Sequence, residues 1–404
     1  MTTSAEQIRS YDGPAIFSYG FRPFFLFGAA WAAVAVAFWL PMLGGQFTLP
    51  TALAPVAWHV HELVYGYVPA VVAGFLLTAV PNWSGRLPVV GAPLASLFAC
   101  WLAGRAAILF SAWIGPIAAA VVDMAFLAAL VVVIAREIVA ARNTRNLKVL
   151  ILVALLLTGN GLFHLEAIAG IGNGHGTRLA IATAIFLIML IGGRIIPSFT
   201  RNWLARCAPG RLPAPFDRFD VGAMAISGMS LASWVMLPAS VITAVSAIAA
   251  CALNVGRLCR WAGERTTAEP LVWILHVAYA FVPIGFGLLS LGILAPGIVA
   301  PTGALHGWTT GAIGLMTLAV MTRASLGHSG RPLMATRSIQ LIYLAALVAA
   351  VVRIAVAFGL MREPMLHLSA TAWVAAFGGF VVIYAPRSAP HGAPEATAAR
   401  STEE

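Results

Sequence analysis

Charged residues are scarce in this chain: they make up 9% of its 404 residues, and Lys148 is the only lysine. The resulting mean hydropathy of +0.91 excludes an ordinary water-soluble domain. None of the four cysteines shares CxxC or CxxCH spacing with another, so a disulfide framework, a thiolate zinc site and c-type haem attachment are not indicated. The sequence contains no HExxH stretch, so a metalloprotease is not indicated. The first 22 residues are polar and lack a cleavable apolar core, so no removable signal peptide is expected.

Long apolar runs are what the sequence has in abundance. Because a bilayer offers no water to backbone groups, each run is expected to be a helix. The runs cover residues 24–43, 56–80, 91–112, 114–135, 147–170, 178–197, 220–238, 240–260, 270–295, 302–322, 338–360 and 365–385. The sequence therefore predicts an all-α integral membrane protein of about twelve transmembrane helices. Its expected parts are a cytoplasmic segment 1–22, a single transmembrane domain 23–386 and a disordered cytoplasmic tail 387–404.

The basic residues predict the orientation. With both termini in the cytoplasm, only four of the 24 Lys and Arg lie on or near the outer face: Arg105, Arg178, Arg353 and Arg362. Positive residues concentrate on the cytoplasmic side of membrane proteins, so this bias favours an orientation with both ends of the chain in the cytoplasm. The net charge of +10 is then a property of loops, and nucleic-acid binding is not expected.

A weak internal repeat relates the second and tenth runs. His61 is followed 25 positions later by Arg86 in a Ser-Gly-Arg tripeptide, and His306 is followed at the same distance by Arg331 in another. His175 precedes Arg201 by 26 positions at the end of the sixth run. These spacings suggest three parallel four-helix units around a pseudo-three-fold axis, an arrangement also compatible with transporters and with haem–copper oxidases.

Ionisable side chains gather near the outer ends of the helices. By helical rise, four histidines lie within roughly 10 Å of the outer boundary. The group comprises the predicted metal ligands His59, His61, His164 and His306, and the predicted catalytic residues Glu62, Tyr65 and Glu166. One such histidine can be a simple packing residue, but four at one depth favour a metal, and imidazoles without cysteine suit copper, haem iron or zinc.

His59 and His61 are two positions apart, so on a regular helix their side chains point about 200° apart. They are therefore expected to serve two metal centres, or one is a metal ligand and the other supports it by a hydrogen bond.

On the cytoplasmic side, His276 is interpreted either as an axial haem ligand or as a packed core residue. Arginines in GFRPFF, PNWSGR, GGRIIPSFTR and GHSGRP turns are candidates to bind haem propionates or simply anchors at the membrane surface. They are Arg22, Arg86, Arg194 and Arg331, with His328 beside the last.

These turns, together with WHVHE and NGLFHLE, resemble the NnrS family from Gly20 to about Tyr384. The resemblance implies a multi-pass bacterial membrane protein that contains haem, expected to be b-type, and copper, and that belongs to the nitric oxide response. Carried over by position, it implies His59, His61, His164, His306 and His328 as metal-site residues, and His276 less securely.

The leading functional hypothesis is an oxidoreductase that reduces nitric oxide to nitrous oxide at an outer-side haem–copper centre. Glu62 and Glu166 would relay protons, and a quinol or redox protein would donate electrons. A true haem–copper oxidase is less favoured because the chain lacks that family's His-His and His-Pro-Glu-Val-Tyr stretches. The alternative from another class is a non-catalytic haem or copper carrier, or a haem-based nitric oxide sensor.

Overall fold

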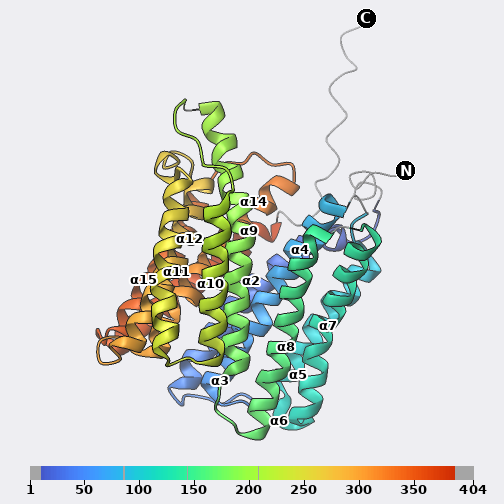
Figure 1. Ribbon diagram of the computed structural model, residues 1–404. Helices are drawn as coiled ribbons and strands as arrows, with labels where there is room; N and C mark the ends of the chain where they lie inside the picture. The colour runs from blue at the N-terminus through green and yellow to red at the C-terminus, as the bar shows by residue number, and fades with distance from the viewer. Residues whose placement is uncertain (1–10, 85–86, 143, 208, 387–404) are drawn as a thin grey trace, which may run out of the picture.

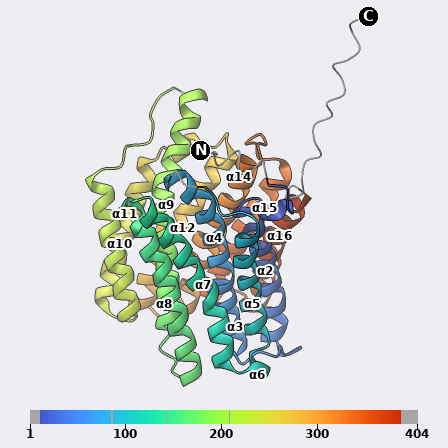
Figure 2. The same ribbon diagram turned by 90° about the vertical axis from the view of Figure 1, so that its right-hand side faces the viewer.

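The computed structural model describes residues 11–84, 87–142, 144–207 and 209–386, and regular structure in this part of the chain is helical (Figures 1 and 2). Among the described residues, eleven helices are long and apolar enough to cross a membrane. The tenth predicted crossing, 302–322, is helical apart from a turn at Leu305, and it is not one of the eleven. The predicted disordered tail 387–404 lies outside the described residues, as does Arg86.

The crossings follow one another in chain order, joined by short loops. The first crossing is α2 (Phe21–Leu43). The second is a continuous segment made of α3 (Pro55–His61), η2 (Glu62–Tyr67) and α4 (Val68–Ser84). The third and fourth are α5 (Ala92–Leu109) and α7 (Pro116–Ala140). The next four are α8 (Leu147–Ala169), α9 (His175–Cys207), α10 (Arg218–Met236) and α11 (Val241–Arg260). The ninth crossing is α12 (Pro270–Leu294). The tenth is made of α13 (Pro301–Ala304), η5 (Gly307–Leu315) and α14 (Met316–His328). The last two are α15 (Arg337–Ala357) and α16 (Arg362–Tyr384). Short helices lie in the connections: η1 (Ala15–Phe17), α6 (Ser111–Ile114), η3 (Thr144–Asn146) and η4 (Gly263–Arg265).

Helix packing repeats with a period of four crossings, as the sequence repeat suggests. Within the units, α5 packs on α7, α10 on α11 and α15 on α16. Between the units, α7 packs on α8, α11 packs on α12, and α16 returns to pack on α2. The bundle is therefore a closed ring of three four-helix units.

Two π-helical segments interrupt the α-helical hydrogen bonding at equivalent places in the repeat. η2 begins directly after His61, and η5 begins directly after His306. Short π segments inside α-helices occur often at functional sites, because the wider turn redirects side chains and frees backbone groups. His61 and His306, which the sequence repeat aligns, therefore share the same local backbone feature.

Three of the four predicted turns are helical where the structure describes them, and one of these is GFRPFF, where α2 begins at Phe21. Pro81 lies inside α4 and Pro197 lies inside α9, which continues to Cys207 and projects beyond its neighbours (Figures 1 and 2). Proline removes one backbone hydrogen bond but does not end a membrane helix whose neighbours support it. The Gly-His-Ser-Gly-Arg stretch does turn, because α14 ends at His328 and Gly330 adopts a φ of +66°.

The bundle has two distinguishable ends. α3 and α6 lie at one, hereafter the α6 end, and the C-terminal part of α9 lies at the other, the α9 end (Figures 1 and 2). His61 stands at the C-terminus of the short α3 and so belongs to the half of the bundle at the α6 end.

Candidate metal centre

The local backbone around His61 is shaped by a glycine and a tryptophan. In the π-helical η2, the carbonyl of Gly66 accepts a hydrogen bond from Trp101 Nε1 of α5 at 2.9 Å. A Cβ at residue 66 would collide with Arg105 and would lie 3.0 Å from Glu62 Oε2. Glycine is therefore needed here so that the side chains of η2 and α5 can meet behind His61.

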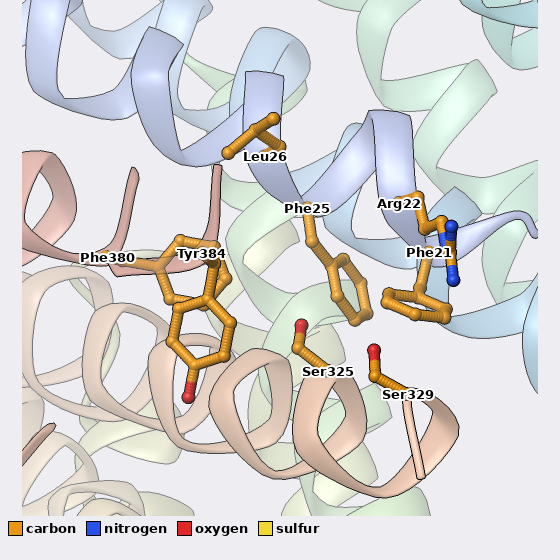
Figure 3. Close-up of a pocket in the computed structure, with 8 residues that line it drawn as sticks. All are labelled: Phe21, Arg22, Phe25, Leu26, Ser325, Ser329, Phe380 and Tyr384. Carbon is orange, nitrogen blue, oxygen red and sulfur yellow. The ribbon is translucent and has the colours of Figure 1, made fainter. Parts of the chain in front are cut away.

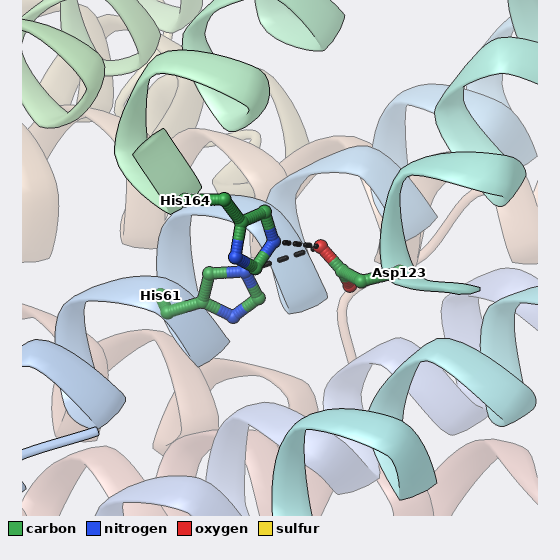
Figure 4. A group of neighbouring side chains, drawn as sticks. All are labelled: His61, Asp123 and His164. Atoms are coloured by element: carbon green, nitrogen blue, oxygen red, sulfur yellow. Dashed lines mark hydrogen bonds and ion pairs between the residues drawn. The ribbon is translucent and has the colours of Figure 1, made fainter. Parts of the chain in front are cut away.

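Three side chains from two crossings, one on α3 and two on α8, converge on one oxygen atom, Oδ2 of Asp123 in α7 (Figure 4). His61 Nε2 lies 3.2 Å from it and His164 Nε2 of α8 lies 3.1 Å from it. Asn160, one turn before His164, donates from Nδ2 to the same oxygen at 2.7 Å. One ligand atom from each of His61, Asp123 and His164 falls within 4.8 Å of the others, and all three residues are buried.

A guanidinium joins the two acidic side chains of this centre. Arg105 Nη1 donates to Glu62 Oε2 at 2.7 Å, and Arg105 Nη2 pairs with Asp123 Oδ1. Trp31 Nε1 of α2 donates to the same Glu62 oxygen at 2.6 Å. The other oxygen of Glu62 lies 3.0 Å from His61 Nδ1. Both ring nitrogens of His61 thus face a carboxylate.

The charges explain why such a cluster can bind a cation. Two carboxylates face one guanidinium, which leaves one negative charge in apolar surroundings, and an uncompensated buried charge is costly. A proton held on His61 between Glu62 and Asp123 would balance it, because both nitrogens of a charged imidazole donate. A metal ion that replaces the Nε2 proton would do the same and could also take His164 Nε2 as a ligand. Two imidazoles and a carboxylate suit copper, zinc or iron.

His59 does not take part in this centre. Its ring stacks on Trp39 of α2 with the ring centroids 4.0 Å apart, and Arg353 of α15 is its charged neighbour. His306 caps η5 and is partly buried, and it is not a member of the His61 group. The structure brings together two of the four predicted metal ligands, His61 and His164.

The remaining predicted catalytic residues lie at the edge of the centre. The Tyr65 ring is 5.5 Å from the His61 ring, and its hydroxyl donates to the Gly176 carbonyl at 2.6 Å. Glu166 instead caps the start of α9, where its Oε1 accepts from the His175 backbone N–H at 2.8 Å and lies 3.3 Å from His175 Nδ1. Tyr65 is thus a neighbour of the metal ligands, whereas Glu166 holds α8 and α9 together.

His276 lies in the half of the bundle at the α9 end and is closely packed. Its Nε2 lies 2.8 Å from the Thr200 hydroxyl. Its Nδ1 is buried without a hydrogen-bond partner in the described part of the chain, and a Cβ added to Gly263 would come within 2.5 Å of it. Both edges of the ring are therefore covered by protein atoms.

Arg22 and His328 both lie near the α9 end, and the pocket beside Arg22 is small. The His328 ring packs against Tyr19 and Phe21 at 5.2 and 5.8 Å. Arg22 Nη1 donates to the Ala15 carbonyl at 3.0 Å and lines a small pocket with Ser325 and other residues (Figure 3). The space inside is about 10 Å³, room for roughly one water molecule.

The other two described arginines of the predicted haem site are scattered. Arg194 is exposed in the middle of α9, and Arg331 follows Gly330 beyond the end of α14. Neither the ring edges of His276 nor the pocket beside Arg22 offers space for a macrocycle. Haem therefore does not fit the described residues at these places, whereas a single metal ion fits the His61 centre.

Two of the residues that build the centre were not predicted as site residues: Asp123 and Arg105. Both are charged residues inside apolar runs, and this pattern alone indicates an intramembrane functional site.

A second buried ion pair was also not predicted. Arg257 Nε binds Asp220 Oδ1 at 3.0 Å, and Arg257 Nη1 donates to the Tyr279 hydroxyl at 2.7 Å. This pair links α10, α11 and α12 in the second and third units.

Comparison with models of protein families gives a match. A sequence model described as "NnrS protein" matches residues 15–388, nearly the whole chain. No curated protein matches the chain.

Proposed function

Because this chain belongs to the NnrS family, and membership supports a membrane protein of the nitric oxide response, we propose that it reduces nitric oxide at a copper centre held by His61, Asp123 and His164. The observation that carries the proposal is the convergence of two imidazole nitrogens on one carboxylate oxygen, at 3.2 and 3.1 Å, inside a membrane bundle. Protein interiors seldom keep such groups together without a partner for their charge.

The surrounding residues support a metal at this position. Glu62 faces His61 Nδ1, so it would fix the tautomer in which Nε2 is free to bind the metal, as carboxylates behind metal-bound histidines do. Arg105 and Trp31 hold Glu62 in place in turn. Exchange of one proton on His61 for a monovalent copper ion leaves the net charge of the buried centre unchanged.

The proposed reaction is 2 NO + 2 H⁺ + 2 e⁻ → N₂O + H₂O. A bound copper ion would supply one-electron redox chemistry and an open position for nitric oxide. The chain's own residues exclude water, since His61, Glu62 and Asp123 are fully or almost fully buried. Glu62 and Tyr65 lie close enough to the ligands to hold a proton beside the reacting gas, and Glu166 lies in the last turn of α8.

We further propose that the α6 end faces outward from the bacterial inner membrane and that both termini are cytoplasmic. The concentration of arginines at the other end supports this orientation. Electrons would come from a quinol or a redox protein.

The test is metal analysis of the purified full chain, followed by nitric oxide consumption and N₂O formation with a reduced mediator. Asp123→Asn and His164→Ala should lose copper and activity together, whereas His367→Ala, which changes an exposed histidine, should keep both. Retention of wild-type copper by both site variants would refute the centre. Copper binding without nitric oxide consumption would instead support the carrier or sensor function.

A further inference from the structure

A second polar cluster lies near the α6 end, on the side of α3 opposite to the metal centre. The rings of His59 and Trp39 stack at 4.0 Å and 21°. His59 Nδ1 and Trp39 Nε1 are both buried, and neither has a hydrogen-bond partner among the described residues. Most buried N–H groups in proteins have an acceptor, because a buried donor without one is costly.

The charge around this cluster is positive. Arg353 of α15 is near enough for its charge to act on His59, and Arg362 at the start of α16 acts on Arg353 in turn. Within the described residues, no carboxylate pairs with Arg353, and Glu363 beside Arg362 is exposed. The cluster therefore presents hydrogen-bond donors and positive charge with no acid to balance them.

The helix repeat relates this cluster to the metal centre. Arg105 and Arg353 each lie four residues before the last residue of their helix, Leu109 or Ala357. His61 and His306 each precede a π-helical segment. Arg353 is therefore the third-unit counterpart of Arg105, whereas His59 and Trp39 reach it from the first unit.

The repeat also shows how the charge is inverted. Asp123 is the eighth residue of α7, and the eighth residue of α16 is Ser369, whose hydroxyl donates to the Ala349 carbonyl at 2.9 Å. The acid of the first unit is replaced by a neutral residue, while the arginine is kept. The repeated arginine therefore has an acid at this helix position in the first unit and a neutral residue in the third.

We propose that Arg353, His59 and Trp39 form an oxyanion-binding site. A guanidinium and an indole N–H are donors suited to the oxygens of an anion, and donor hydrogen bonds to a charged group are strong. The shared chemistry is a negatively charged oxygen group, supplied either by a small inorganic anion or by the phosphate of a lipid headgroup. The site is separate from the metal centre, and its test needs no metal.

The experiment uses the full chain in detergent and measures its unfolding midpoint as sodium nitrite, nitrate or phosphate is raised to about 10 mM against a chloride background. Native mass spectrometry of delipidated protein offered phosphatidylglycerol or phosphatidylcholine tests the lipid source. The variants are Arg353→Gln, Trp39→Phe, which keeps the ring stack and removes the N–H, and the control Arg337→Gln at the exposed start of α15.

A saturable rise of the unfolding midpoint with a soluble oxyanion would identify an inorganic anion. Arg353→Gln should then lower the apparent affinity for that anion at least about tenfold, and Trp39→Phe should lower it less. Selective retention of phosphatidylglycerol by the wild type and not by Arg353→Gln would identify a headgroup. Without any anion, Arg353→Gln should unfold no earlier than the wild type, because it removes an unpaired charge. The proposal is overturned if Arg353→Gln and Arg337→Gln behave alike in both assays.

Discussion

Replacement of Arg105 by glutamine should reveal how the metal centre balances its charge. In the metal-free protein, Arg105 and a proton on His61 would together offset Glu62 and Asp123, all within one buried group. Arg105→Gln leaves one carboxylate uncompensated, and removal of one partner of a buried ion pair costs about 3 to 5 kcal/mol. Adding Glu62→Gln to this variant restores the neutrality of the buried group. The double variant should therefore recover roughly 2 to 3 kcal/mol of the free energy of unfolding, since only hydrogen bonds are then lost.

The assay is unfolding of the metal-free chain by a denaturing detergent, followed by tryptophan fluorescence, on both single variants and the double variant. Arg136→Gln serves as the control because Arg136 is 66% exposed and pairs with Glu137 at the surface, where such a change costs about 0 to 1 kcal/mol. A double variant that is less stable than Arg105→Gln alone would refute the charge argument, because it would show that the two changes add instead of compensating.

Three further outcomes are expected. Gly263→Ala should destabilise the chain by about 1 to 3 kcal/mol, because the added methyl meets a His276 ring that Thr200 holds from the other side, whereas Gly297→Ala, with open space around it, should not shift the unfolding midpoint. Trp31→Phe should weaken copper binding by about 10- to 100-fold in a competition titration, since it removes a donor to Glu62; unchanged affinity would show that Glu62 does not support His61. Arg260 holds the pKa of Asp217 below its usual value, so the stability from this N-cap is present above the unfolded pKa and lost as the pH falls below about 4. Asp217→Asn should therefore flatten the acid side of the unfolding profile, and an unchanged profile would count against this pair.

Hydropathy alone predicts the fold well, because apolar length and charge asymmetry are the physical requirements for crossing a bilayer. The spacing of His61 and His306 from their Ser-Gly-Arg tripeptides also anticipates the threefold packing of the helices. The helix ends are less predictable from sequence. Pro81 and Pro197 look like stops in a single sequence, but neighbouring helices support the backbone around them, and only tertiary structure reveals that support.

Part of the metal centre is also predictable. His61 and His164 are expected from their equal depth, and the different surroundings of His59 follow from the 100° step of a helix. The third member of the buried group, Asp123, is separated from both histidines by tens of residues, and depth does not reveal which helix faces are in contact. Its identification needs the packing of α7 between α5 and α8.

The closure of the ring by α16 on α2 has a consequence for how the protein is made. Every group of the metal centre, from Trp31 to His164, is contained in the first five crossings, so this centre can assemble while the rest of the chain is still being synthesised. The oxyanion site joins α2 and α3 to α15, so it has to wait until nearly the whole chain has entered the membrane. Metal loading and anion binding would then report on early and late stages of biogenesis in the same molecule.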